Sequence, residues 1–295
     1  MSILTLRNIS KRYGSLQALR EVSFEVPRGS VFGILGPNGS GKTTLLGIVT
    51  DVLKADTGDF TLFDQLPTAA QRRQIGTLLE TPNFYHYLSG YKNLQITAAV
   101  KQRDEKDIAR VLEIAGLTAR QHAAFKTYSL GMKQRLAIAN TLLGDPDVLI
   151  LDEPSNGLDP AGIAEVRGLI RQLAQSGKTI IMASHLLDEV EKVCTHVAVL
   201  QKGKLLTSGP VNTVMVREDF VELGSSDMNR LETVVRQHPL FGHLVIADGG
   251  LQVFFTGVID PGELNSWLAG NGIWLNHLQV RRKSLESAFL EMTQN

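Results

Sequence analysis

The chain has 295 residues, more than one small domain needs, so we expect one large domain and a smaller one. Hydrophobic residues make up 43% of the chain and charged residues 20%, the balance of a globular protein with a sizeable core. Thirty basic residues are matched by thirty acidic ones, and a strong non-specific nucleic-acid binder would need a basic face. We therefore expect no nucleic-acid partner.

The apolar runs, the N-terminus and the cysteine content indicate in which cell compartment the protein lies. No stretch approaches the ~20 apolar residues that a membrane span requires, and the N-terminus alternates like a strand instead of forming a signal segment. The one cysteine, Cys194, cannot form an internal disulfide, and its apolar neighbours favour a buried, unreactive thiol. We expect a cytoplasmic protein.

Short apolar runs separated by turns begin the chain. Residues 3–6 and 22–26 alternate polar and apolar side chains, which predicts antiparallel strands. Residues 31–35 are apolar throughout or glycine, as in a strand covered on both faces. A helix is predicted over residues 43–49.

Residues 84–145 are predicted to be mostly helical, because apolar residues recur at helical spacing in 104–115 and 132–143. Strands and helices alternate after them, which predicts a parallel sheet with helices on both sides. These later elements are strands 148–151 and 179–183, helices 161–175 and 186–193, and a hairpin of 196–200 and 204–207.

The pattern changes at about residue 216 to a predicted order of βαββαβ with a closing helix, which matches a ferredoxin-like unit. We therefore expect two domains, 1–215 and 216–295. The strands of the second are predicted at 220–223, 244–247, 252–255 and 274–280, and its helices at 229–237, 261–269 and 285–292.

A glycine-rich segment between the apolar strand and the first helix carries a complete Walker A pattern. Glycines let backbone N–H groups crowd a triphosphate, and the following helix directs its positive end there. We expect Lys42 to reach the outer phosphates of ATP and Thr43 to offer its hydroxyl to Mg²⁺. The whole segment is Gly36-Pro37-Asn38-Gly39-Ser40-Gly41-Lys42-Thr43-Thr44.

A second apolar strand ends in two acids, Asp152 and Glu153, which is a Walker B pattern. Asp152 at the strand tip is placed to hold Mg²⁺, and Glu153 to orient and polarise the attacking water. An apolar strand followed by two acids is weak evidence alone. Behind a Walker A loop it predicts ATP hydrolysis.

The segment from Tyr128 to Arg135, Tyr-Ser-Leu-Gly-Met-Lys-Gln-Arg, resembles the signature motif of ABC ATPases. The resemblance covers roughly residues 1–210 and implies two copies facing head to tail. In that arrangement Ser129 and Gly131 would bind the γ-phosphate in the partner's site. The usual motif has two glycines after the serine, and Leu130 replaces the first.

Further residues follow the same resemblance. Asp159, in Asn-Gly-Leu-Asp, is similar to the D-loop aspartate that crosses the dimer interface. His185 after a predicted strand resembles the switch histidine that contacts the γ-phosphate, and Tyr13 resembles the aromatic residue that stacks on adenine. A polar surface histidine and a core tyrosine are the alternative interpretations.

A departure from the family appears at Glu80, where the family normally has a glutamine that senses the metal and the attacking water. A carboxylate can bind Mg²⁺ through water, but it adds negative charge. A loop-capping residue is the alternative. Residues 80–85, the signature segment and Ser284-Leu285-Glu286 resemble the antibiotic-resistance branch, whose members export bacitracin or lantibiotic peptides.

The resemblance implies a P-loop NTPase of the α/β class with an antiparallel β subdomain, a helical insert at about 84–145 and a small C-terminal α+β domain. It implies ATP and Mg²⁺ as cofactors, and as partners a second copy and a separate integral membrane permease at the inner face of the cell membrane. The loop from 80 to 91, with Phe84, Tyr85 and Tyr87 expected to be exposed, would contact that permease. A soluble ABC ATPase, a nucleotide-switched module and an importer subunit are the alternatives.

Overall fold

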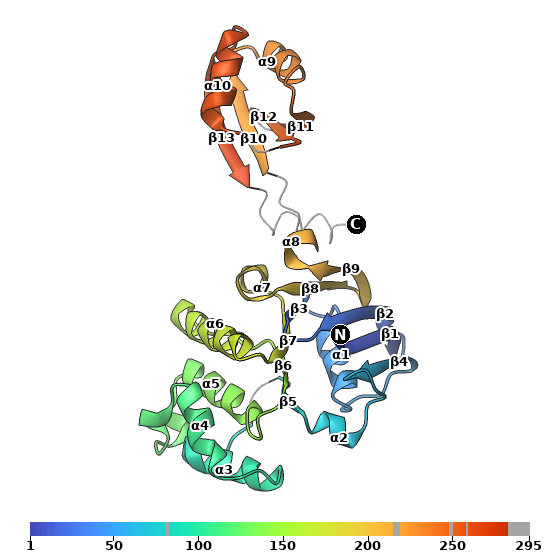
Figure 1. Ribbon diagram of the computed structural model, residues 1–295, viewed down its shortest axis with the longest axis vertical. Helices are drawn as coiled ribbons and strands as arrows, with labels where there is room; N and C mark the ends of the chain where they lie inside the picture. Colours follow the sequence, from blue (N-terminus) through green and yellow to red (C-terminus); the bar gives the residue numbers. More distant parts are fainter. Residues whose placement is uncertain (81–82, 215–218, 248–249, 258, 283–295) are drawn as a thin grey trace. The chain divides into compact units, whose positions relative to one another are not determined.

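The computed structural model describes residues 1–80, 83–214, 219–247, 250–257 and 259–282. The chain forms two compact units, Met1–Val214 and Met215–Asn295, each with its own core (Figure 1). None of the helices in these described ranges combines the length and apolar character that crossing a bilayer requires.

The central sheet of the first unit has the order β5-β6-β7-β3-β8-β9. Its first five strands are parallel, and the last pairs antiparallel with β8. The three middle strands are buried at every position because helices or a second sheet cover both faces. The strands are β3 (Val31–Leu35), β5 (Ile75–Leu78), β6 (Val148–Asp152), β7 (Thr179–Ser184), β8 (His196–Gln201) and β9 (Lys204–Pro210).

A smaller antiparallel sheet has the order β2-β1-β4 and consists of β1 (Ser2–Tyr13), β2 (Leu16–Pro27) and β4 (Thr57–Leu62). Helix α1 (Lys42–Val49) lies between this sheet and the central one, and its apolar residues join both in one core (Figure 1). The predicted strands 3–6 and 22–26 are confirmed, but both are longer than expected. Strands β4 and β5 and the short helix α2 (Ala69–Arg72) were not predicted.

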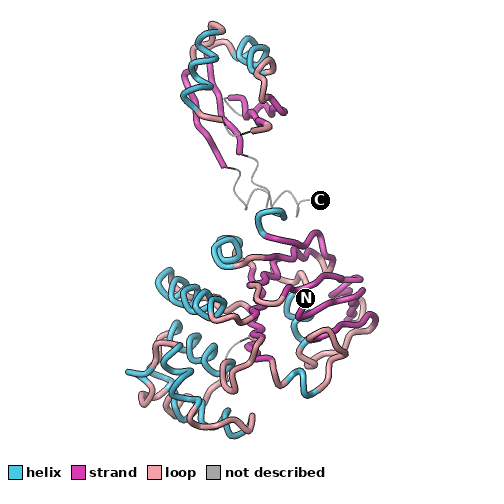
Figure 2. Tube along the Cα trace, viewed as in Figure 1, coloured by secondary structure: helices cyan, strands magenta, loops and turns pink. Residues whose placement is uncertain are grey.

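Helices are inserted between β5 and β6, on the other side of the central sheet from α1 (Figure 2). They are α3 (Gly90–Val100), α4 (Asp107–Ile114) and α5 (Leu130–Thr141), with 3₁₀ turns η1 (Thr118–Arg120) and η2 (Phe125–Thr127). The helical prediction for this region is confirmed. Helix α4 begins three residues later than expected because the Asp104 side chain accepts a hydrogen bond from the Lys106 N–H in a turn, 2.9 Å.

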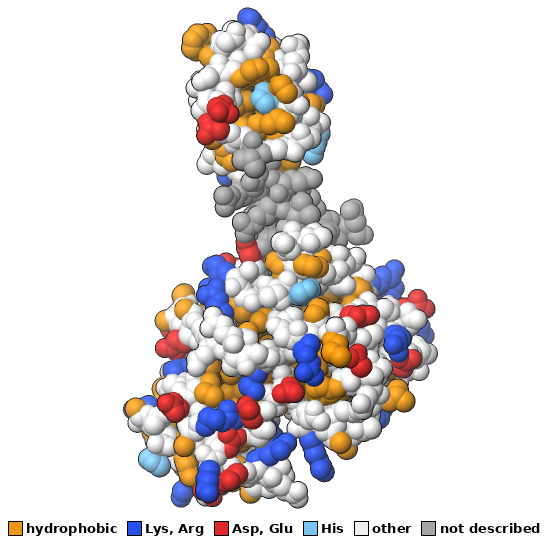
Figure 3. Space-filling view, viewed as in Figure 1, with side chains coloured by type: hydrophobic (Ala, Val, Ile, Leu, Met, Phe, Trp, Pro, Cys, Tyr) orange, Lys and Arg blue, Asp and Glu red, His pale blue; other side chains and the backbone are white. Residues whose placement is uncertain are grey.

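The remaining helices of the first unit are α6 (Pro160–Gln175), α7 (Leu187–Val193) and α8 (Val211–Val214). Strands β6 to β9 and helices α6 and α7 confirm the predicted alternation. Figure 3 shows basic and acidic side chains interspersed over one face of this unit, in keeping with the balanced charge of the chain.

The second unit has the element order β10 (Asp219–Ser225), α9 (Met228–Val235), β11 (Phe241–Ala247), β12 (Gly250–Phe255), α10 (Pro261–Gly270) and β13 (Leu275–Arg282). Its sheet order is β11-β12-β10-β13, and every adjacent pair is antiparallel. Leu231, Val235, Leu264 and Leu268 of the two helices pack into its core. The predicted helix 285–292 and residues 248–249 of the predicted turn lie outside the described residues.

Cys194 follows α7 and is 8% exposed, and burial followed by the negative charge of Glu189 raises the pKa of its thiol to about 12. Only the thiolate reacts with iodoacetamide, so at pH 8 the folded protein should be alkylated roughly a thousandfold or more slowly than the chain in urea. Mass spectrometry of timed samples measures both rates. Similar rates would contradict the burial of this thiol.

Candidate nucleotide-binding and hydrolysis site

The predicted chemical residues follow the carboxyl ends of neighbouring parallel strands. Glu80 lies two residues after β5, Asp152 ends β6 with Glu153 next, His185 follows β7, and Gly36 follows β3. Parallel strands end at the same edge of a sheet, where ligands bind in open α/β folds. The register places Asp152 beside Ala183 and Leu35 beside Ser184, so residues far apart in sequence meet here.

The Walker A segment forms a tight loop from the buried strand β3 into α1. A Cβ atom at Gly36 would lie 2.3 Å from the Leu200 carbonyl oxygen, so a larger residue could not fit. At Gly41 the backbone has φ +105°, and a Cβ atom would lie 2.6 Å from the Ala18 oxygen. Both glycines are therefore required by the loop geometry.

Lys42 is the centre of the loop. Its side chain is almost buried, and Nζ donates to the Gly36 oxygen at 2.7 Å and the Pro37 oxygen at 3.3 Å. Its ion-pair partner is Glu153, with 3.3 Å between Nζ and Oε1. A buried ammonium requires such partners, because an unpaired charge in a low dielectric is costly.

The other carboxylate oxygen of Glu153 contacts the histidine. Glu153 Oε2 lies 2.8 Å from Nδ1 of His185, and the His185 backbone N–H donates to the same oxygen at 3.4 Å. Glu153 itself has φ +48°, a left-handed conformation just after β6. Lys42, Glu153 and His185 therefore form one continuous polar chain, which Glu80 does not join by any contact among the described residues.

Asp152 is 3% exposed, and its Oδ1 has no hydrogen-bond partner in the described part of the chain. Burial raises the pKa of this carboxyl, as do the charges of Glu153 and Glu80, whereas a hydrogen bond with Thr43 and the charge of Lys42 lower it. A buried acceptor without a partner indicates a site for a ligand or cation. The buried Ser40 hydroxyl in the Walker A loop also has no hydrogen-bond partner among the described residues.

These oxygens suit a hard cation. Mg²⁺ keeps several waters and is typically held by one or two carboxylates together with substrate phosphates. Thr43 and Asp152 can supply a hydroxyl and a carboxylate, and Glu80 lines the same pocket. Within the described residues no cluster of three or more His, Cys, Asp or Glu could hold a metal ion.

A pocket of ≈ 520 Å³ covers the Walker A loop, and Tyr13 lies in its wall. Tyr13 ends β1, is 44% exposed, and has Lys11 Nζ 5.7 Å from its ring centre. The pocket thus combines an aromatic face with phosphate-binding groups. Sequence reasoning missed the other lining residues from β2 and the β8–β9 turn, because nothing in a strand pattern marks them: Leu16, Gln17, Ala18, Arg20 and Lys202.

Glu80 lies in a second pocket of ≈ 660 Å³, which shares Thr43 and Glu153 with the first. The backbone of Glu80 is left-handed, φ +57°. Tyr85 and Tyr87 in the following loop are 52% and 73% exposed, as expected. The expectation for Phe84 is wrong: its ring is half-buried and packs edge-on against Phe125, 5.1 Å between centroids.

Ser129 and Gly131 do not line the Walker A pocket of their own chain. Ser129 is exposed and caps α5, where its Oγ accepts from the Met132 N–H at 3.2 Å. Leu130 is the first residue of that helix, has a negative φ and is 51% exposed, so it replaces the glycine without backbone strain. Asp159 is also exposed and caps α6 by accepting from the Gly162 N–H at 2.8 Å.

A buried contact behind His185 was not predicted. Glu189 in α7 is 5% exposed and accepts from the Ser184 hydroxyl at 3.3 Å, and that hydroxyl accepts from the Leu186 N–H at 3.0 Å. These bonds hold the turn that carries His185 toward Glu153. An acid in the first turn of a helix is common, so no sequence signal could have distinguished this one.

Together these features define a P-loop NTPase of the α/β class. The ABC transporter family profile matches residues 19–156. The bacitracin transport ATP-binding protein BcrA of Bacillus licheniformis is 36% identical over 99% of this chain and 95% of its own. The lantibiotic transport ATP-binding protein SrtF of Streptococcus pyogenes is 37% identical over 69% of this chain and 89% of its own.

A protein of Bacillus subtilis described as the ABC transporter ATP-binding protein YhcH is 40% identical over 99% of this chain and 96% of its own. Among solved structures, cbiO1 of Clostridium perfringens, part of the ABC transporter complex cbiONQ, has a TM-score of 0.67 at 30% identity. It covers 72% of this chain and 90% of its own.

The chain therefore belongs to the ABC transporter family as an ATP-binding subunit. The similarity to cbiO1 confirms the ABC ATPase fold of the first unit. Proteins of this family bind ATP, hydrolyse it to power transport, and act as dimers with membrane permeases, so the chain is an ATPase.

Proposed function

We propose that two copies of this chain bind and hydrolyse ATP with Mg²⁺ and thereby drive a separate membrane permease that exports an antibiotic peptide, a drug or a lipid-like cargo. The observation that carries the proposal is the polar chain Lys42–Glu153–His185 at the edge of the parallel sheet. In this chain Glu153, which would act on water, contacts both the Lys42 ammonium, which would bind phosphate, and the His185 ring.

The nucleotide would occupy the pocket between Tyr13 and the Walker A loop, with adenine on the tyrosine ring. The loop N–H groups, Lys42 and Thr44 would hold the phosphates. Lys42 pairs with Glu153 in this structure, so a triphosphate would compete for the same ammonium. Glu153 would then be free to orient the attacking water and accept its proton, while His185 holds the carboxylate in place.

Mg²⁺ would be held by the Thr43 hydroxyl and the Asp152 carboxylate, with Glu80 able to contribute through water. When bound, it would offset the charge that develops on the transferred phosphoryl group. Two observations on Asp152 support this assignment: its Oδ1 has no hydrogen-bond partner among the described residues, and its carboxyl group has a hydrogen bond with Thr43.

The second copy would complete each site. Ser129, Gly131 and Asp159 lie outside the Walker A pocket of their own chain, and Ser129 presents its hydroxyl at the exposed start of a helix. A helix N-terminus with a hydroxyl suits the γ-phosphate of a nucleotide held by another chain. Because ATP would bind the closed pair more tightly than the open one, its hydrolysis would release the pair.

Export is favoured by the relatives, whose names describe bacitracin and lantibiotic transport. The exposed Tyr85 and Tyr87 would contact the permease and hold the chain at the inner face of the cell membrane. We assign residues 1–215 to the ATPase domain, with its helical subdomain at about 84–145. The strand order and antiparallel pairing of the second unit support a ferredoxin-like domain over 216–295.

Drug susceptibility of the native host tests the function. A host carrying Glu153→Gln should become several-fold more sensitive to bacitracin or to a lantibiotic, measured as the minimal inhibitory concentration beside the wild type. If the variant host keeps its drug susceptibility but grows more slowly on one nutrient, the result would indicate import. Unchanged susceptibility to peptides, drugs and membrane-active lipids would overturn the export proposal. ATP hydrolysis is tested separately, by measuring phosphate release from the purified wild-type chain.

Replacing Glu80 by Gln tests the departure from the family pattern. The amide keeps the shape of the side chain and removes one negative charge from the pocket that Glu80 shares with Asp152. Because Glu80 would contact Mg²⁺ only through water, ATP affinity in the presence of Mg²⁺ should stay within about twofold. The ratio of transport to hydrolysis should change, since this residue joins the sheet to the helical insert. Calorimetry measures the ATP affinity, and transport and phosphate-release assays measure the ratio. An unchanged ratio would show that Glu80 has no function in coupling and only caps the loop.

A further inference from the structure

A basic pocket of ≈ 400 Å³ lies where the end of α3 meets the start of β5. It shares no lining residue with the two pockets at the nucleotide site. Four cationic side chains and no acidic one line it: Arg72, Arg73, Lys101 and Arg103.

Three of these cations, Arg73, Lys101 and Arg103, form no ion pair with an acid among the described residues. Lys101 Nζ donates to the Asn140 carbonyl at 3.0 Å, and an Arg103 nitrogen donates to the Arg73 carbonyl at 2.9 Å, so both contact neutral groups. The Arg73 guanidinium makes no ion pair or hydrogen bond in the described part of the chain. Arg72 is paired with Asp51 at 3.1 Å, and its buried Nε has no hydrogen-bond partner within the described ranges.

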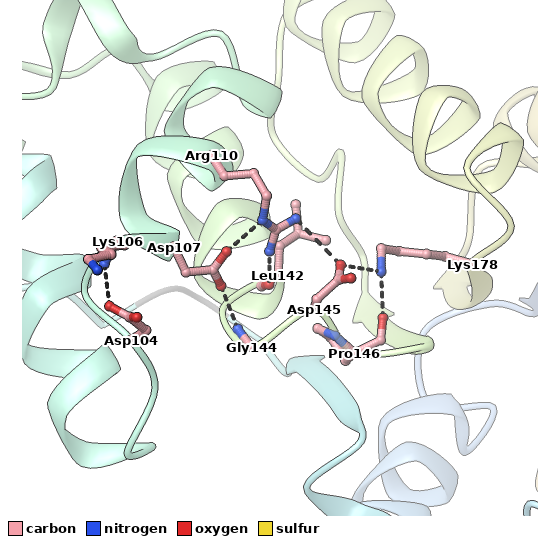
Figure 4. A network of polar contacts seen from close by, with 9 residues as sticks. All are labelled: Asp104, Lys106, Asp107, Arg110, Leu142, Gly144, Asp145, Pro146 and Lys178. Carbon is pink, nitrogen blue, oxygen red and sulfur yellow. Dashed lines mark hydrogen bonds and ion pairs between the residues drawn. The ribbon is translucent and has the colours of Figure 1, made fainter.

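The acids nearby are already committed to other groups (Figure 4). One oxygen of Asp107 accepts from Arg110 Nε at 2.5 Å and the other from the Gly144 N–H at 2.7 Å. Asp145 Oδ1 pairs with Lys178 at 2.9 Å and with Arg110 at 3.4 Å. Both carboxylates thus have other hydrogen-bonding and ion-pair partners, although the charge of Arg103 also helps to lower the pKa of Asp107.

The electrostatic consequence is visible at Lys101. Burial lowers the pKa of its ammonium, and the positive charge of Arg103 lowers it further. Like charges held together disfavour folding unless a counter-charge joins them. A cluster of this kind indicates an anionic ligand.

We propose that this pocket binds a phosphate group, either free or as the headgroup of an anionic phospholipid. A carboxylate has one charge and two oxygens and would be satisfied by a single arginine fork. Three cations that form no ion pair instead match a group with up to two charges and several acceptor oxygens. The buried Leu143 and Pro146 in the wall leave room beside the phosphate for an organic substituent.

The ligand would join two parts of the ATPase unit. Arg72 and Arg73 lie just before β5 in the sheet core, whereas Lys101 and Arg103 follow α3 in the helical insert. A bound phosphate would therefore stabilise the insert against the core. Hydrogen exchange of the amides in residues 72–75 and 100–103 should slow when the ligand is present.

Calorimetric titration of inorganic phosphate into the full chain tests the site, with MgADP present so that the Walker A loop is filled. Arg73→Gln should weaken phosphate binding about tenfold or more, because it removes a charge-assisted contact. The Arg73 side chain is exposed and has no hydrogen bond or ion pair with another described residue, so the variant should fold. Arg73→Lys should retain part of the affinity. Arg28→Gln removes an equal charge from an exposed turn and should change nothing.

Flotation with phosphatidylglycerol vesicles, compared with phosphatidylcholine vesicles, distinguishes a phospholipid headgroup from free phosphate as the ligand. Arg73-dependent flotation identifies a lipid headgroup; phosphate binding without flotation identifies the free ion. The proposal fails if wild type binds neither probe, or if Arg73→Gln matches Arg28→Gln. It also fails if a polyglutamate peptide displaces phosphate and binds more tightly, which would indicate an acidic protein segment.

Discussion

Replacing Glu153 by Gln should lower steady-state ATP hydrolysis by about 10²–10⁴-fold, the contribution of a positioned general base. The amide keeps the shape of the side chain, and its one oxygen can still accept from Lys42 or from His185, whose atoms lie 3.3 and 2.8 Å from the two carboxylate oxygens. ATP affinity should therefore be kept or improved, because one negative charge beside the triphosphate is removed. The variant should accumulate as a closed dimer.

Phosphate release and size-exclusion chromatography with light scattering, with and without MgATP, measure these effects. Glu113→Gln is a matched control, since Glu113 is an exposed residue of α4 far in sequence from the site, and its turnover should equal wild type. Turnover of Glu153→Gln within twofold of wild type would show that another group activates the water. Loss of ATP binding would mean that this carboxylate has a structural function instead.

Lys42→Ala should weaken ATP binding by about ten- to a hundredfold, because each charge-assisted hydrogen bond contributes about 1.5–3 kcal/mol. Its ammonium is nearly buried and has two carbonyls and Glu153 around it, so no water-exposed group can replace it. Removal also leaves Glu153 without a cation. Hydrolysis should fall by at least as much as binding.

Isothermal titration with MgATP measures the affinity, and thermal unfolding checks that the fold is intact. Lys204→Ala, at an exposed position of β9, is the control for loss of a positive charge and should bind as wild type does. Unaltered affinity in Lys42→Ala would remove the assignment of the Walker A loop. A lower unfolding temperature without MgATP, together with weak binding, would instead indicate a packing defect.

Much of the fold could be predicted because its strongest patterns are local. Strand β3 has the predicted bounds, and β6, β7 and α6 differ by one residue at an end, since continuous apolar runs and helical spacing mark them clearly. Strand β4 escaped prediction because its first three residues are exposed and one is glycine. Strand β5 has only four residues, too few for a periodic signal.

For the site, the residue types and their order along the chain determined which chemistry is possible: a glycine-rich loop with Lys42 and a strand ending in Asp152 and Glu153 require no folded coordinates to identify. Only the tertiary structure decided which of these residues contact one another. The parallel register joins β6 to β7 and so brings Glu153 to His185, 32 positions apart. Burial isolates Asp152, and the basic pocket arises because α3 ends beside the start of β5. Distance and desolvation depend on the whole packed chain, so local sequence cannot encode them by itself.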